Sequence, residues 1–213
     1  NPTNVMGASK RIAEIYVQSL FLHLKETQND CTKFITTRFG NVLGSNGSVV
    51  PYFKKLLSQG GPITVTHPDI IRYFMTIPEA SSLVLEAATL GNGGEIFVFD
   101  MGQPVKIADL ARNMIRLAGF VPGKDIEIIY TGLRPGEKLY EELLNQKELT
   151  IPTSNEKILV AKVREYDYIT VKDQIEQLIA TAQTGKVFPT VQIMKEIVPE
   201  FKSKNSPYEQ LDK

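Results

Sequence analysis

The 213-residue sequence contains no tryptophan, one cysteine and two histidines. The single cysteine, Cys31, excludes an internal disulfide and suits a protein of a reducing compartment. The two histidines, His23 in a predicted helix and His67 in a loop before Pro68, are too few for a credible metal site. His67 is interpreted as a loop residue rather than as an acid or base. Disulfide-stapled and metal-dependent classes of protein are therefore not expected.

The sequence also lacks net charge and long apolar runs. Lysine and arginine together number 24, as do aspartate and glutamate, so no overall field favours nucleic acid or an anionic membrane surface. The apolar runs fall far short of the roughly 18 residues that a bilayer-spanning helix needs, and no signal-peptide pattern is visible. Since 42% of the residues are hydrophobic, a sizeable core can form. We expect a soluble globular piece without a membrane segment.

The dinucleotide-binding fingerprint Gly-x-Gly-x-x-Gly is absent as well. Gly91, Gly93 and Gly94 precede a predicted strand rather than a helix, so they are interpreted as a turn. The first predicted element is a helix that starts within the first few residues, with no preceding strand to pack on. Such a start is typical of the middle of a fold, and we expect the front half of the fold to lie before Asn1.

Helices and strands are predicted in alternation along the chain. Apolar residues recur at helical spacing over 5–25, 49–58, 78–90, 107–118, 171–182 and 190–197, and a short helix is predicted over 140–144. Short apolar or β-rich runs predict strands over 33–39, 62–65, 95–100, 126–130 and 157–163. The tail from Lys202 is polar and is expected to be loose. This alternation favours parallel βαβ units and therefore the α/β class.

The first predicted helix carries Met6 and Lys10, which are four residues apart and so share one face. Asn4 suits the N-cap of this helix. The Lys10 ammonium can hold two ribose hydroxyls or an anionic group, although a helix lysine is more often simply solvated. For Met6 the ordinary alternative is packing in the core.

A second motif follows the strand predicted over 33–39. The run Arg38-Phe39-Gly40-Asn41 ends this strand and leads into the glycine-bearing loop 44–48. The Asn41 amide can donate to a phosphate, and backbone N–H groups of residues 45–48 can form an anion-binding nest. The sequon at Asn46 is interpreted as coincidental, because no secretory signal is visible.

A third motif is Arg134-Pro135-Gly136-Glu137. Arg134 offers a fork of donors that suits a diphosphate, Pro-Gly forms a turn, and Glu137 can accept from ribose hydroxyls. Alone, such a turn is more often a surface salt bridge. Arg72, among large apolar neighbours, needs an anionic partner, since burying a lone guanidinium is costly. A structural salt bridge is as good an explanation of Arg72 as a ligand.

Taken together, segments 2–10 and 38–45 resemble the extended short-chain dehydrogenase/reductase family. In that family a Tyr-x-x-x-Lys helix precedes a strand that ends in Arg-x-x-Asn-Val-x-Gly. Met6 stands at the tyrosine position, which resembles the polysaccharide-biosynthesis branch of nucleotide-sugar 4,6-dehydratases. A thioether exchanges no proton. The resemblance therefore assigns the acid/base work to an Asp–Lys pair that precedes this sequence.

The resemblance implies the C-terminal part of a Rossmann-like parallel sheet and a small α/β substrate-binding lobe. The dinucleotide-binding part is expected over about 1–60 and 78–105, the substrate lobe over 61–77 and 106–200, and a polar tail over 201–213. The residues implied at the cofactor are Lys10, Arg38 and Phe39. Those implied at the substrate are Asn41, Arg72, Arg134 and Glu137.

The resemblance also implies an activity. The full-length relative would use NAD or NADP to convert a UDP-N-acetylhexosamine, such as UDP-N-acetylglucosamine, into a 4-keto-6-deoxy sugar. These 213 residues alone are expected to be inactive. The alternatives are a nucleotide-sugar 4-epimerase, which normally has tyrosine where Met6 stands, and a non-catalytic nucleotide-sugar-binding module. The expected partners are a UDP-sugar and further copies of the chain, in the cytoplasm, and for the full-length protein at the inner face of the membrane.

Overall fold

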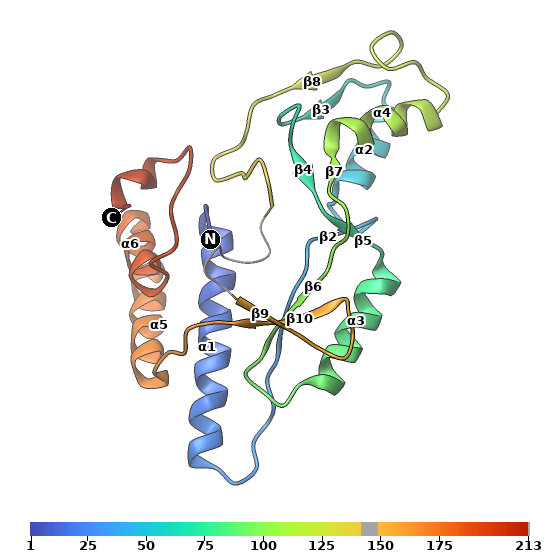
Figure 1. Ribbon diagram of the computed structural model, residues 1–213. Helices are drawn as coiled ribbons and strands as arrows, with labels where there is room; N and C mark the ends of the chain where they lie inside the picture. The colour runs from blue at the N-terminus through green and yellow to red at the C-terminus, as the bar shows by residue number, and fades with distance from the viewer. Residues whose placement is uncertain (142–148, 213) are drawn as a thin grey trace.

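The computed structural model describes residues 1–141 and 149–212 (Figure 1). Its helices are α1 (Val5–Thr27), α2 (Val49–Ser58), α3 (Ile77–Leu90), α4 (Ile107–Leu117), α5 (Tyr168–Gln183), α6 (Val187–Ile197) and the 3₁₀ helix η1 (Pro207–Leu211). Its strands are β1 (Thr36–Arg38), β2 (Asn41–Val42), β3 (Ile63–Val65), β4 (Ile71–Arg72), β5 (Phe74–Met75), β6 (Ile96–Phe99), β7 (Val105–Lys106), β8 (Ile128–Tyr130), β9 (Leu149–Pro152) and β10 (Ile158–Lys162). The longer predicted helices are confirmed to within a few residues. The short helix predicted over 140–144 falls largely outside the described residues.

The main sheet has the strand order β1-β6-β10-β9. Strand β1 runs parallel to β6, with Thr36 opposite Ile96, whereas β10 runs antiparallel to β6 and β9 antiparallel to β10. The α/β class with a parallel strand pair is therefore confirmed. The expectation of parallel pairing is wrong for the strand predicted over 157–163, because β10 forms an antiparallel hairpin with β9 and runs antiparallel to β6. Strand β9 was not predicted from the sequence.

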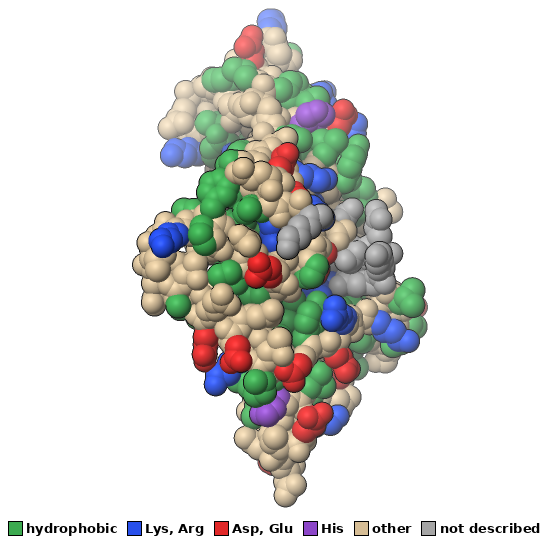
Figure 2. All heavy atoms as spheres, turned by 90° about the vertical axis from the view of Figure 1, so that its left-hand side faces the viewer, with side chains coloured by type: hydrophobic (Ala, Val, Ile, Leu, Met, Phe, Trp, Pro, Cys, Tyr) green, Lys and Arg blue, Asp and Glu red, His purple; other side chains and the backbone are tan. Residues whose placement is uncertain are grey.

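Helices pack around this sheet in a lower body of the molecule (Figure 1). Phe97 and Phe99 of β6 pack with Leu83 and Ala87 of α3, so α3 covers one face of the sheet. The long helix α1 stands beside α5 and α6, and its apolar stripe packs against both of them. The core residues shared by these three helices and the segment after α6 are Ala8, Ile12, Ile15, Val171, Val191, Ile193, Met194, Ile197, Val198 and Phe201. Viewed from the side of these helices, the surface intersperses charged side chains of both signs with apolar ones (Figure 2).

The upper lobe has its own core. Phe53 of α2 packs with Ile63 and Val65 of β3 and with Ala111 and Ile115 of α4. Strand β8 pairs in parallel with β3, and β7 pairs antiparallel with β4. Helices α2 and α4 thus pack against each other and against β3, and short two-stranded pairs complete the lobe. The domain boundaries expected from the sequence remain a prediction.

The C-terminal tail is not loose, which corrects the expectation for residues from Lys202 onward. Ser206 caps η1: its hydroxyl accepts from the Tyr208 N–H at 3.2 Å, and its own N–H donates to Glu209 Oε1. The Lys195 ammonium forms an ion pair with Asp212. Hydrogen bonds and an ion pair, rather than apolar packing, hold residues 202–212 in place. The prediction was wrong because it was based on the low apolar content of this segment. Within residues 1–141 and 149–212, no helix combines the length and apolar character needed to cross a bilayer.

Candidate functional site

Helix α1 begins at Val5, directly after its N-cap residue Asn4. Asn4 has extended backbone angles, and its side chain accepts the N–H of Gly7 at 2.8 Å. The buried stripe of the helix faces α5 and α6, which leaves the predicted Met6–Lys10 face open. Met6 is 64% exposed and Lys10 is exposed, so Met6 does not belong to the core of this chain. The face that carries Met6 and Lys10 is therefore accessible to a ligand.

The turn 134–137 docks onto the start of α1. The Gly136 carbonyl accepts from Thr3 Oγ1 at 2.7 Å and from Asn4 Nδ2 at 3.1 Å. The Gly136 N–H donates to the carbonyl of Lys204 at 2.7 Å. Gly136 has a φ of +72°, and a Cβ there would lie 2.4 Å from Asn4 Cβ. Only glycine fits, and the docking brings two predicted motifs together across more than 130 residues of sequence.

Two predicted substrate residues, Arg72 and Glu137, contact each other. Glu137 Oε1 accepts from Thr66 Oγ1 at 3.0 Å and lies 3.5 Å from Arg72 Nη2. Glu137 Oε2 accepts from the backbone N–H of Arg134 at 3.0 Å. Arg72 Nε also lies 3.3 Å from Glu141 Oε2. Arg72 therefore has the structural salt bridge that the sequence left open, and the Arg134 side chain is exposed.

Asn41 begins β2, which pairs with β5, the strand that follows Arg72 along the chain. Its N–H donates to the Tyr73 carbonyl at 3.0 Å, and β2 pairs in parallel with β5 so that Asn41 stands opposite Phe74. Gly40 allows this approach, because a Cβ there would meet the Tyr73 carbonyl at 3.2 Å. The backbone thus places Asn41 next to the segment that follows Arg72, while its role at a phosphate stays a prediction.

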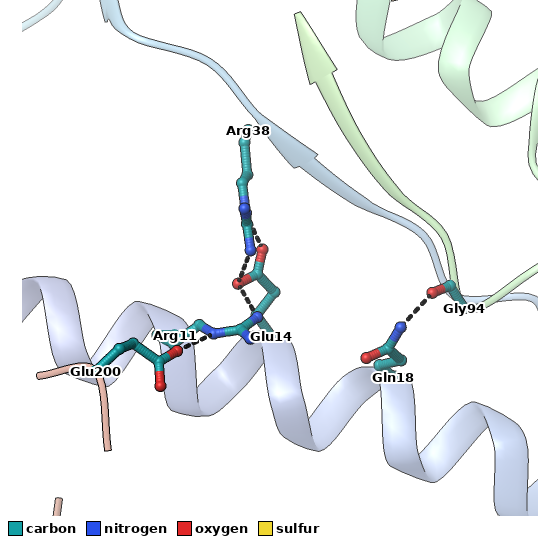
Figure 3. Close-up of polar contacts among 6 residues, drawn as sticks. All are labelled: Arg11, Glu14, Gln18, Arg38, Gly94 and Glu200. Atoms are coloured by element: carbon teal, nitrogen blue, oxygen red, sulfur yellow. Dashed lines mark hydrogen bonds and ion pairs between the residues drawn. The ribbon is translucent and has the colours of Figure 1, made fainter. Parts of the chain in front are cut away.

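The predicted cofactor residues Arg38 and Phe39 have structural partners. Arg38 Nε lies 2.5 Å from Glu14 Oε1, and its Nη2 donates to Glu14 Oε2 at 2.9 Å (Figure 3). The Phe39 ring stacks on Phe99 with centroids 5.5 Å apart. These contacts join β1 to α1 and to the core beneath α3. A role for either residue at a cofactor remains a prediction.

Glu14 is a buried carboxylate that the sequence analysis missed. It is 8% exposed and also accepts from Arg11 Nη1 at 2.9 Å, while Arg11 Nε donates to Glu200 Oε1 at 3.0 Å (Figure 3). Burial by itself would lower the pKa of Arg11, but the charges of and hydrogen bonds to Glu14 and Glu200 outweigh it and raise that pKa. One sequence signal could have indicated that Glu14 is buried: it lies between Ile12 and Ile15, two residues of the apolar stripe of the helix.

Two hollows border the docked turn. One of about 260 Å³ is lined by Asn4 and Met6 of the α1 start, by Gly136, and by Ser203 and Tyr208 of the tail. A wider one of about 750 Å³ is lined by residues on both sides of the turn and of the C-terminal segment, among them Pro2, Glu137, Lys138, Tyr140, Lys202 and Lys204. Within the described part of the chain, no three His, Cys, Asp or Glu side chains gather as metal ligands would. The hollows and the turn are the candidate binding site.

The fold and these motifs define a Rossmann-like α/β protein of the short-chain dehydrogenase/reductase type. Residues 1–163 match the family described as "Polysaccharide biosynthesis protein", and the chain belongs to that family.

Curated relatives agree with this assignment. The chain is 57% identical over 179 residues to the capsular polysaccharide biosynthesis protein CapD of Staphylococcus aureus, covering 84% of this chain and 29% of CapD. It is 35% identical over 150 residues to a UDP-N-acetylglucosamine 4,6-dehydratase (inverting) of Campylobacter jejuni, covering 70% and 41%. It is 33% identical over 148 residues to a UDP-glucose 4-epimerase of Rickettsia bellii, also covering 70% and 41%. The chain thus spans less than half the length of these relatives.

Solved structures show the same fold. Pen from Bacillus thuringiensis superposes with a TM-score of 0.64 at 34% identity, covering 76% of this chain and 48% of Pen. The dTDP-glucose 4,6-dehydratase of Bacillus anthracis, solved in complex with NAD, superposes with a TM-score of 0.51 at 20% identity. This second likeness covers 62% of this chain and 42% of that structure, and it concerns the fold alone.

Proposed function

We propose that this chain supplies the nucleotide-sugar-binding part of a UDP-N-acetylhexosamine 4,6-dehydratase. The observation that carries the proposal is the docking of the turn 134–137 onto the start of the helix that bears Met6 and Lys10. A ligand held at the turn would then extend toward the open face of α1. The identity to a UDP-N-acetylglucosamine 4,6-dehydratase supports this choice of substrate.

The turn is suited to a nucleoside diphosphate. Arg134 presents a fork of N–H donors that matches two phosphate oxygens, and its side chain is exposed. Its chain neighbours Pro135 and Leu133 line the smaller and the wider hollow respectively. Thr66 and Arg72 fix the orientation of the Glu137 carboxylate, and ribose hydroxyls can replace them as its hydrogen-bond donors. Asn41 would add an amide donor from the neighbouring strand pair. These residues bind and orient the substrate and take no proton.

Lys10 is our candidate for the cofactor. Its ammonium lies on the open face of α1, one turn from Met6, where it can donate to the ribose hydroxyls of NAD or NADP. When bound, the nicotinamide would accept hydride from sugar C4 and return it within the same turnover. Met6 exchanges no proton, so it would only fill space beside the sugar. The acid/base groups would belong to a longer protein, and we expect no turnover from these 213 residues alone.

The binding step can be tested on the chain itself. We expect UDP and UDP-N-acetylglucosamine to bind in a calorimetric titration, and Arg134→Ala to weaken binding about tenfold through loss of a charged contact. Arg116→Ala, at an exposed position of α4, is the matched control and should leave the affinity unchanged. Failure of the unsubstituted chain to bind UDP would refute the binding role.

The reaction is tested on a longer protein that contains this chain. With UDP-N-acetylglucosamine we expect a 4-keto-6-deoxy product, detected by mass loss of one water. A 4-epimer of unchanged mass would instead favour the second candidate, an epimerase, which the 33% identity to a UDP-glucose 4-epimerase keeps open. Binding without any product would favour a non-catalytic module. A cytoplasmic location and self-association remain predictions.

A further inference from the structure

The C-terminal segment is closed by one buried ammonium. Lys195 is 8% exposed, and its Nζ forms an ion pair with Asp212 and donates to Ser203 Oγ at 2.9 Å and to the Phe201 carbonyl at 3.3 Å. An ammonium has three donors, so all three are used. The same Nζ lies 4.0 Å from the centre of the Phe201 ring. The contacts tie both ends of segment 201–212 to α6.

The closed segment reaches the candidate site through its main chain. Asp212 Oδ1 also accepts from the Ser203 N–H at 3.2 Å, which fixes the strip 202–204. From this strip the Lys202 N–H donates to the Pro2 carbonyl at 3.2 Å, and the Lys204 carbonyl accepts from the Gly136 N–H at 2.7 Å. Figure 1 shows this segment rising beside the start of α1. The strip 202–204 therefore contacts both the turn, at Gly136, and the segment before α1, at Pro2.

We propose that Lys195 and Asp212 are positioning residues for the turn 134–137: they fix the strip 202–204, which holds Gly136 against the start of α1 and so preorganises Arg134 for a nucleoside diphosphate. Neither residue touches the turn itself. They lie beyond residues 1–163, the part that matches the family. The effect on ligand binding rests on the proposed function, whereas the effect on the turn does not.

The physical reason is preorganisation. A turn that opens and closes binds its ligand only in the closed fraction of the population, so its apparent affinity falls with that fraction. Lys202 and Lys204 are exposed. Ser203 is the buried residue between them, and the Lys195–Asp212 pair is what it hydrogen-bonds to. Weakening the pair should therefore open the turn before it opens the sheet.

Amide hydrogen exchange measured by NMR tests this coupling. In Asp212→Asn we expect the Gly136 N–H to exchange at least about tenfold faster, while Val98 in the central strand β6 changes less than about twofold. Asp212→Glu keeps the carboxylate and should retain most of the Gly136 protection. Lys157→Met removes the exposed ion pair with Glu79 and serves as the matched control, with no change at Gly136.

The outcomes are distinct. Unchanged Gly136 exchange in Asp212→Asn overturns the proposal, and so does equal acceleration of Gly136 and Val98, because the pair would then be merely structural. If Asp212→Asn fails to fold, Ser206→Ala replaces it, because this change removes the side-chain cap of η1, the helix that leads to Asp212. Exchange of the Gly136 and Val98 N–H groups is then compared in Ser206→Ala in the same way. UDP affinity should fall about three- to tenfold in Asp212→Asn. If UDP binds to no variant, the proposed function fails while the Gly136 result still decides the positioning role.

Discussion

Two glutamates, one in the lower body and one at the docked turn, pair with arginines in different ways. Glu14 is 8% exposed and receives two guanidinium groups at 2.5–2.9 Å on its two oxygens. Glu137 is 19% exposed, borders the 750 Å³ hollow and has its arginine at 3.5 Å. Its other donors are one hydroxyl and one backbone N–H. The first carboxylate is closed off by its partners, whereas the second remains accessible.

The difference teaches how to separate a structural ion pair from a binding one. In this buried place, three guanidinium N–H groups contact the two oxygens of Glu14 at 2.5–2.9 Å. A ligand would have to displace Arg38 and one of the two ion pairs of Arg11, which is costly. The contact between Arg72 and Glu137 is longer, at 3.5 Å, so less free energy is needed to break it, and Glu137 lines the 750 Å³ hollow. The two sites contain the same residue types, so what distinguishes a structural ion pair from a binding one is whether the carboxylate is buried by its partners or remains accessible. We call the network around Glu14 closed and the one around Glu137 open.

The largest effect is expected at the closed network. Glu14→Gln removes the charge that Arg11 and Arg38 share, so the free energy of unfolding should fall by about 2–4 kcal/mol in urea titrations. UDP affinity should stay unchanged. Glu176→Gln is the matched control, since it breaks an exposed pair with Lys172 at 3.8 Å and should cost less than about 0.5 kcal/mol. A smaller loss for Glu14→Gln than for the control would contradict our view of Glu14.

The next effect concerns the turn that carries Glu137. Gly136→Ala adds a Cβ at a φ of +72° and drives it against Asn4, so we expect a loss of about 2–3 kcal/mol and about tenfold weaker UDP binding. Gly132→Ala is a close control in the same loop. Gly132 has a φ of +85° but open space around its Cβ position, so only about 1 kcal/mol of backbone strain is expected. Equal losses in both variants would mean that docking contributes nothing.

Much of the fold could be predicted because helices leave a local signal. The pattern of apolar residues predicted α2 at its observed bounds and α4 to within one residue. The strands β2, β4, β5 and β7 have two residues each and exist only through partners more than 30 residues away. The antiparallel turn-back of β10 depends likewise on the path of the chain in space. Local patterns do not contain this information.

The candidate site divides in the same way. The motifs around Lys10, Asn41 and Arg134 could be found from residue types and their order. The hydrogen bond from Thr66 to Glu137 joins residues 71 apart, and nothing near either residue indicates it. Nothing in the sequence around Lys195 distinguishes it from other helix lysines, because its burial depends on how the C-terminal segment folds back over it.

A third experiment makes at Glu137 the same chemical change as at Glu14. Glu137→Gln keeps an acceptor for Thr66 but loses the charge facing Arg72, and the free energy of unfolding should fall by only about 1 kcal/mol. UDP affinity should fall about three- to tenfold, because the amide is a weaker acceptor for ribose hydroxyls. The two variants should thus show opposite ratios of stability loss to affinity loss. Equal ratios would remove the distinction between the closed and the open network.

The smallest effect is expected from pH, at the tail that supports the turn. Burial opposes ionisation of Asp212, but the hydrogen bonds from Lys195 and the Ser203 N–H and the charge of Lys202 hold the pKa of its carboxyl below the ordinary value. Because the folded pKa lies below the unfolded one, the carboxylate stabilises the fold above the ordinary pKa, and this contribution is lost as pH falls through the folded value. The stability gap between the unsubstituted chain and Asp212→Asn should therefore be largest near about pH 6 and narrow toward about pH 3. Urea titrations across this range measure it. A gap that stays constant with pH would mean that the Asp212 charge does not hold the strip 202–204. A gap that narrows toward about pH 3 would mean that the ionised carboxylate holds this strip and thereby supports the turn that carries Glu137.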